Sequence, residues 1–196
     1  MYDYIKGELA ELTPTEVVIE AYNVGYKILI SLQTYSKLQA GRDSKLYIHH
    51  HVREDAELLF GFADKDERTI FCHLIEVSGI GPNTARTMLS SMTSDEIRNA
   101  IITGDVNKLK SIKGIGLKTA QRLLIELKDK IGRSSTATLV GSYFPSEFDS
   151  QRDEAVSALV LLGFSKANVD KVVDIILRES PGCKLEELIK QSLKRL

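Results

Sequence analysis

The sequence contains one short glycine motif twice. Residues 78–85 read SGIGPNTA and residues 113–120 read KGIGLKTA, so Gly-Ile-Gly-x-x-Thr-Ala recurs at an offset of 35 positions. Two glycines around one apolar residue permit a turn that is too tight, or too positive in φ, for other residues. Apolar residues at helical spacing come before and after each copy. Each copy therefore predicts a tight turn between two helices.

The two turns also predict a phosphate-binding surface. Their backbone N–H groups would face outward at the start of the following helix, where free donors and the helix dipole attract anions without reading a base. The alternative is a helical hairpin whose glycines only let two helices pack closely, which repetition of the whole motif disfavours. Two nucleotide-binding motifs are excluded. The dinucleotide-binding fingerprint requires a third glycine and a preceding strand, which are absent here, and the Walker A motif is interrupted by Leu117.

Charge is distributed unevenly along the chain, although the net charge is only −1. Residues 1–64 contain 6 Lys and Arg against 10 Asp and Glu, whereas residues 65–133 contain 12 against 8. The positive charge therefore coincides with the repeated motif. Because the local potential governs binding to a polyanion, this segment is the expected nucleic-acid-binding part.

The rest of the pattern predicts an α+β multi-domain protein. Residues 1–64 contain five β-rich runs separated by turn residues, which favours a small closed or Greek-key barrel. Residues 65–132 change to helical spacing. Residues 133–152 are rich in Ser, Thr, Gly and Pro and are expected to form a flexible linker. Residues 153–196 predict three short helices.

Two local signals refine the helical part. Thr93 and Glu96 form a capping-box pattern that opens another helix between the two copies. Gly104 then suits the C-terminal end of that helix.

The repeat resembles the helix-hairpin-helix DNA-binding motif in tandem. Together with the barrel and HVREDAELLFGF at residues 51–62, it makes the whole chain resemble the RuvA family of Holliday-junction-binding proteins. The resemblance implies an OB-fold barrel, a tandem helix-hairpin-helix domain, a linker and a small three-helix, UBA-like C-terminal domain. It also implies a homotetramer that holds an open, square junction on one face. Whether one tetramer or two facing tetramers clasp the junction stays open.

The resemblance assigns sequence-independent DNA contacts to both turns and to basic residues near them. The predicted contacts are Gly79, Gly81, Thr84, Arg86, Gly114, Gly116, Lys118, Thr119, Arg122 and Arg53. The first copy has Pro82-Asn83 where the second has Leu117-Lys118. We therefore expect the second turn to contribute more electrostatic binding.

Glu54 and Asp55 match the acidic pin that the family places at the centre of the tetramer. There they would repel phosphates and keep the exchanging strands apart. Without the resemblance, this segment is an ordinary solvated turn. A metal-dependent nuclease site is disfavoured, because two adjacent acidic residues without further ligands do not hold a catalytic Mg²⁺ ion well. The three histidines at 49–51 alternate faces on a strand, so they do not converge on one ion, and we expect no metal or cofactor.

Leu161, Leu162, Gly163 and Phe164 form either core or a partner patch at the end of a C-terminal helix. The resemblance implies contact with the hexameric ATPase RuvB, with the resolvase RuvC as a further candidate partner. The chain has no ATP motif, so we expect a non-enzymatic adaptor. The alternative is a helix-hairpin-helix nuclease or repair lyase that uses Lys118. No signal peptide or membrane-length apolar run is evident, which predicts a cytoplasmic protein.

Overall fold

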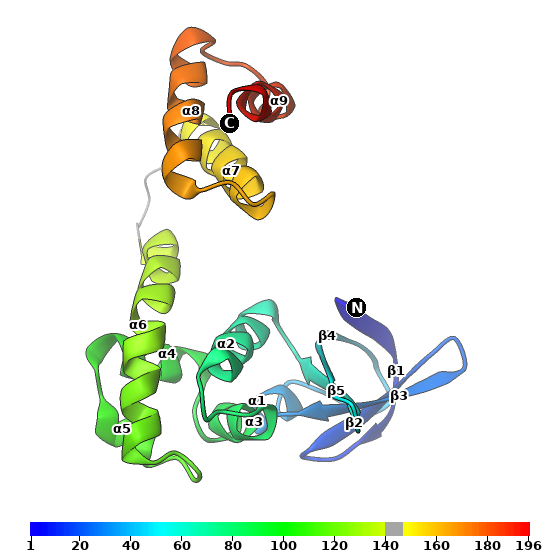
Figure 1. Ribbon diagram of the computed structural model, residues 1–196. Helices are drawn as coiled ribbons and strands as arrows, with labels where there is room; N and C mark the ends of the chain where they lie inside the picture. The colour runs from blue at the N-terminus through cyan, green and yellow to red at the C-terminus, as the bar shows by residue number, and fades with distance from the viewer. Residues whose placement is uncertain (140–146) are drawn as a thin grey trace. The chain divides into compact units, whose positions relative to one another are not determined.

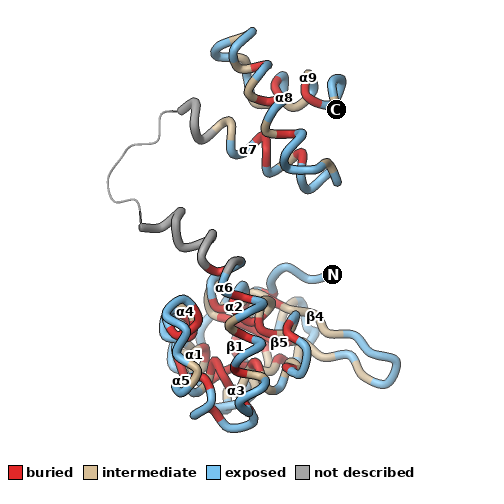
Figure 2. Tube along the Cα trace, turned by 60° about the vertical axis from the view of Figure 1, so that its left-hand side comes forward, coloured by how far each residue is buried: buried red, intermediate tan, exposed pale blue. Residues whose placement is uncertain are grey.

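The computed structural model describes residues 1–139 and 147–196, without the side chains of residue 129 and of residues 132–150. The chain divides into two compact units, Met1–Leu139 and Val140–Leu196 (Figure 1). Figure 2 shows buried residues gathered inside each unit. The barrel and the repeated motif both belong to the first unit.

Five strands form a closed barrel in the order β1-β2-β3-β5-β4. The strands are β1 (Tyr4–Leu12), β2 (Glu16–Ala21), β3 (Val24–Ile30), β4 (Asp43–Val52) and β5 (Glu57–Phe62). All neighbouring pairs are antiparallel except β3 and β5, which are parallel. Alternate aliphatic residues point inward, including the fully buried Ile19, Ile28 and Leu46. The predicted OB-like barrel is confirmed.

One glycine is required for the barrel to close. A Cβ atom on Gly7 of β1 would lie 2.1 Å from the carbonyl oxygen of Glu20 on β2. Real side chains do not tolerate such a contact with the backbone, so only glycine permits this close approach of the two strands.

The helical part of the first unit follows directly after the barrel. Its helices are α2 (Lys65–Glu76), α3 (Pro82–Ser91), α4 (Ser94–Thr103), α5 (Val106–Lys110) and α6 (Leu117–Leu139). The Thr93–Glu96 capping box is present, and Gly104 ends α4 with a φ of 75°, so both predicted helix signals are confirmed. The helices share one buried core with Phe60 and Phe62 of β5.

A buried carboxylate joins the barrel to these helices. The short helix α1 (Leu32–Tyr35) follows β3, and the hydroxyls of Ser31 and Thr34 both donate to the Glu67 carboxylate, the Thr34 bond being 2.7 Å long. Burial raises the pKa of Glu67, although the two hydroxyl donors oppose that rise. The Gln33 carboxamide adds a bond from the Ser94 N–H at 3.2 Å. The barrel therefore positions the repeated motif through specific polar contacts.

Over residues 147–196, the second unit forms three helices, as predicted: α7 (Glu147–Leu161), α8 (Lys166–Glu179) and α9 (Leu185–Arg195). They pack around a small aliphatic core that includes Leu159, Val173 and Leu188. Arg152 of α7 binds Asp174 of α8 at 2.7 Å. None of the helices in the described part of the chain has the length and hydropathy of a membrane span.

The range expected to be a linker, residues 133–152, contains the ends of two helices. Helix α6 continues to Leu139 and α7 begins at Glu147. Residues 140–146 lie outside the described residues. The flexibility of this segment and the exact domain boundaries therefore stay predictions.

Candidate nucleic-acid interface

The first copy of the motif forms a tight turn between α2 and α3, which we call the first glycine turn (residues 77–81). Gly79 has a φ of 95°, a conformation that side chains disfavour. The Ile80 N–H donates to the Val77 carbonyl at 3.0 Å. Ile80 itself is only 4% exposed, so its side chain fills the core beneath the turn.

The second glycine turn (residues 112–116), between α5 and α6, repeats this geometry. Gly114 has a φ of 92°, and the Ile115 N–H donates to the Ile112 carbonyl at 3.1 Å. Ile115 is also 4% exposed. Each following helix starts with the same bond, Ala85 N–H to Gly81 at 3.0 Å and Ala120 N–H to Gly116 at 2.9 Å. The prediction of two like turns with inward-facing isoleucines is confirmed.

The outer surfaces of both turns are open. No described atom outside the neighbouring residues lies within 4 Å of a Cβ placed on Gly81, Gly114 or Gly116. Gly81 has an ordinary φ of −88°, and no described side chain caps the first amides of α3 at this residue. Neither helix packing nor backbone strain therefore explains glycine at position 81. An open surface beside free amides is what an approaching phosphate needs.

The two glycine turns are neighbours in the folded unit. A Cβ on Gly79 would lie 4.0 Å from the Thr119 hydroxyl at the start of α6. Arg122 of α6 also donates to the Ser78 carbonyl at 3.4 Å. The structure thus brings two segments, 35 positions apart in sequence, onto one surface.

The predicted side chains around the turns lie in three different settings. Lys118 and Arg122 are exposed beside the second glycine turn, while Thr84 and Thr119 are half-buried at the starts of α3 and α6. Arg86 differs, because its guanidinium is half-buried and donates to the carbonyl of Thr15 at 3.1 Å. Burial also lowers the pKa of Arg86. Its observed contact thus joins α3 to the barrel.

The predicted acidic pin forms the acidic turn (residues 53–56) between β4 and β5. The Arg53 N–H donates to the Ala56 carbonyl at 2.8 Å and closes the turn. Glu54 and Asp55 are exposed, and neither carboxylate has a hydrogen bond or ion pair within the described part of the chain. A cleft of about 120 Å³ is lined by this turn and by Pro82 and Asn83 of α3. The acidic turn therefore borders the start of α3.

The three histidines alternate faces on β4, as expected. His49 packs against Phe71 of α2, whereas His50 binds the Glu57 carboxylate at 2.6 Å. Residues 1–139 and 147–196 contain no cluster of three or more His, Cys, Asp or Glu side chains arranged to hold a metal ion. Arg53 donates from Nε to His51 Nε2 at 2.9 Å, a contact that we did not predict. Strand alternation, which places residues two apart on one face, could have found it.

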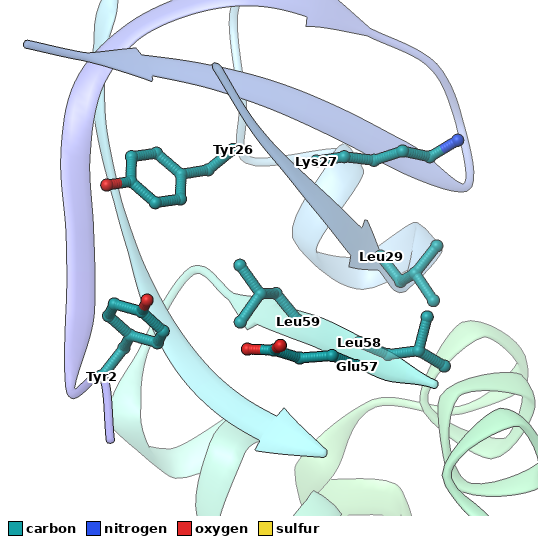
Figure 3. Close-up of a pocket in the computed structure, with 7 residues that line it drawn as sticks. All are labelled: Tyr2, Tyr26, Lys27, Leu29, Glu57, Leu58 and Leu59. Carbon is teal, nitrogen blue, oxygen red and sulfur yellow. The ribbon is translucent and has the colours of Figure 1, made fainter. Parts of the chain in front are cut away.

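A separate pocket of about 340 Å³ lies on the barrel (Figure 3). Its lining residues are Tyr2, Tyr26, Lys27, Leu29, Glu57, Leu58 and Leu59. It contains none of the predicted DNA contacts. We therefore leave it outside the candidate interface.

The predicted partner patch at the end of α7 contains both exposed and core residues. Leu161 and Leu162 are 88% and 61% exposed, whereas Phe164 packs against the core of the second unit. Gly163 adopts a φ of 101° and ends the helix. Of these four residues, only the two leucines present a large apolar surface to solvent.

Comparisons with known proteins agree with this architecture. Three family models match: "RuvA N terminal domain" at residues 1–61, "SAM-like Helix-hairpin-helix tandem" at 71–129, and "RuvA, C-terminal domain" at 150–196. Proteins named Holliday junction branch migration complex subunit RuvA are similar over the full length of both chains. They are 50% identical in Bacteroides thetaiotaomicron, 48% in Bacteroides fragilis and 47% in Flavobacterium psychrophilum. The chain belongs to the RuvA family.

Proposed function

We propose that this protein binds four-way junction DNA through its phosphates, without reading sequence, as the non-enzymatic subunit of a branch-migration complex. The observation that carries the proposal is the pair of neighbouring glycine turns, which repeat one hydrogen-bond pattern and share open outer surfaces. The names of the relatives support the same function.

Each glycine turn would hold one stretch of sugar-phosphate backbone. The free amides at the start of α3 and α6 supply donors, and the helix dipoles add positive potential. Lys118 adds exposed positive charge beside the second turn, and Arg122, which donates to the Ser78 carbonyl, adds its charge next to both turns. Because phosphates are the same in every sequence, this surface positions DNA but does not select bases.

A homotetramer would give each arm of a four-way junction an equivalent pair of glycine turns, since fourfold symmetry matches four arms. The acidic turns would then meet where the strands cross. Unpaired Glu54 and Asp55 carboxylates repel phosphates within roughly 8–10 Å, about one Debye length. That repulsion would keep the crossing strands apart while they exchange partners.

The second unit would recruit the motor. Leu161 and Leu162 form an exposed apolar pair at the end of α7, which suits contact with a partner protein. We assign this pair to the hexameric ATPase RuvB, which would supply the energy for branch migration. The resolvase RuvC is a further candidate partner on the assembled junction.

One experiment tests the proposal directly. The purified full-length protein is mixed with a labelled four-way junction and Mg²⁺, and binding and strand integrity are followed on native and denaturing gels. We expect a shifted junction with every strand intact, and equal affinity for junctions of unrelated sequence. Strand cleavage would instead favour a nuclease or lyase, and absence of a shift would refute junction binding.

A further inference from the structure

Buried polar side chains gather at one place, where the barrel meets the helices. In the described part of the chain, five polar or charged residues are buried, and four of them lie at this contact: Ser31, Thr34, Glu67 and Ser94. A buried polar group costs free energy unless it is hydrogen-bonded, whereas a fully bonded network fixes one geometry. The contact between the barrel and the helices is therefore built for a definite orientation.

Two hydroxyls from the barrel side hold one carboxylate from the helices. Glu67 lies in the first turn of α2, and its carboxylate accepts from Ser31 Oγ and, at 2.7 Å, from Thr34 Oγ1. Thr34 Oγ1 in turn accepts from the Ala63 N–H at 3.1 Å. Among the described residues, no cation bonds to Glu67, so its carboxylate depends on these two hydroxyls.

The neighbouring residues of α1 bind the other two helices. The Leu32 N–H donates to Ser90 Oγ of α3 at 3.1 Å. The Ser94 N–H of α4 donates to Gln33 Oε1 at 3.2 Å, and Gln33 Nε2 donates back to Ser94 Oγ at 3.4 Å. Ser94 is the first residue of α4, so Gln33 supplies a partner for an amide that has none within its own helix. Three consecutive residues, Leu32, Gln33 and Thr34, thus bind three different helices.

These contacts lie between the two kinds of turn that the proposed function uses. The acidic turn belongs to the barrel, because β4 and β5 remain paired up to Val52 and Glu57 on either side of it. In the described chain, no hydrogen bond or ion pair joins the acidic turn to α3, although both line one cleft. Apolar burial is non-directional, whereas hydrogen bonds are directional. The α1 contacts are therefore suited to set the spacing between the acidic turn and the glycine turns.

We propose that the α1 contacts, with Glu67 at their centre, set the selectivity of this protein for a four-way junction over linear duplex. The inference rests on the proposed function and deepens it. A linear duplex needs only the glycine turns. A junction must also fit the acidic turns at its crossover, in several protomers at once. Glu67 and Gln33 are thus positioning residues that touch no DNA.

Paired affinities test this role. Fluorescence anisotropy at one salt concentration gives the affinity for a four-way junction and for a linear duplex with the sequence of one arm. Glu67→Leu replaces the carboxylate by an apolar side chain, and Gln33→Met removes both bonds to Ser94. We expect each variant to weaken junction binding about tenfold, because misaligned sites lose simultaneous engagement. Duplex binding should change less than about twofold, because the glycine turns are intact.

Two further variants separate positioning from stability. Glu67→Gln keeps an oxygen acceptor and should retain most of the wild-type ratio of junction to duplex affinity. Gly104→Ala is the matched control, because Gly104 ends α4 with a φ of 75° and lies outside α1 and both glycine turns. It should lower the temperature of thermal unfolding and leave that ratio unchanged. Gln33 is half-buried and loses only its carboxamide, so Gln33→Met decides the test if Glu67→Leu does not fold.

The outcomes distinguish this inference from the proposed function. If the wild type prefers the junction and the folded variants keep its ratio, only the present inference fails. Equal losses of junction and duplex affinity would also overturn it, since they indicate general damage to the fold. If the wild type does not bind the junction, the proposed function fails and this inference fails with it.

Discussion

Replacing Gly81 by valine should weaken DNA binding far more than it lowers the stability of the fold. The φ of Gly81 is −88°, which valine adopts freely, and no described atom outside its chain neighbours lies within 4 Å of a Cβ at this position. Glycine is a better helix N-cap than valine by less than about 1 kcal/mol. The free energy of unfolding should therefore fall by no more than about 1 kcal/mol.

The effect on affinity should be larger. The new side chain occupies the open space beside the first amides of α3, so a phosphate cannot approach them closely. Loss of one hydrogen bond to a charged group is worth about 1.5–3 kcal/mol, which corresponds to about a 10- to 150-fold weaker complex. Fluorescence anisotropy with a four-way junction measures affinity, and chemical denaturation measures stability.

Gly104→Ala is the matched control. Gly104 also has open space around it, but its φ of 75° strains any side chain at the end of α4. We expect it to lose about 1–2 kcal/mol of stability and no junction affinity. If Gly81→Val binds within twofold of wild type, the first glycine turn does not contact phosphate and the reasoning is refuted.

Three further predictions concern other parts of the chain. Glu54→Gln with Asp55→Asn should keep or raise junction affinity while changing the branch-migration rate; a marked loss of affinity would contradict repulsion by the acidic turn. Leu161→Ala with Leu162→Ala should leave thermal unfolding unchanged, because both side chains are exposed, but should abolish stimulation of the partner ATPase; full stimulation would place the contact elsewhere. Burial raises the pKa of Glu67 above its usual 4.5, so its contribution to stability is present below pH 4.5 and is lost as pH rises through the raised pKa. The free energy of unfolding of the wild type should therefore fall, relative to that of Glu67→Gln, as pH rises. A difference between the two proteins that stays constant across the pH range would contradict this prediction.

The sequence predicted those features that depend on local pattern. The repeated Gly-Ile-Gly identifies both turns, because a positive φ and an inward isoleucine are local requirements, and Gly79 and Gly114 show the same geometry. The five β-rich runs likewise match the five strands, because apolar and polar residues that alternate along a strand indicate which face is buried. Thr93 and Glu96 form the predicted capping box for the same reason.

Long-range contacts could not be predicted in this way. Glu67 lies in the charged run Lys65–Arg68 and has the pattern of an exposed first helical turn, yet Ser31 and Thr34 bury it from across the barrel junction. Arg86 follows the first glycine turn closely in sequence, but its guanidinium binds Thr15, which is 71 positions away. The periodicity of apolar residues along the sequence does not predict contacts between distant segments. The approach of Arg53 to Asn83 depends on tertiary structure in the same way.

The central claim is that main-chain amides beside the two glycine turns bind phosphates. A structure of the protein on a four-way junction, at a resolution that places phosphate oxygens, tests it most directly. We expect phosphate oxygens within about 2.7–3.2 Å of amide nitrogens at the starts of both α3 and α6. Glycine turns that are covered by protein, or that face solvent while DNA lies on another surface, would contradict the account.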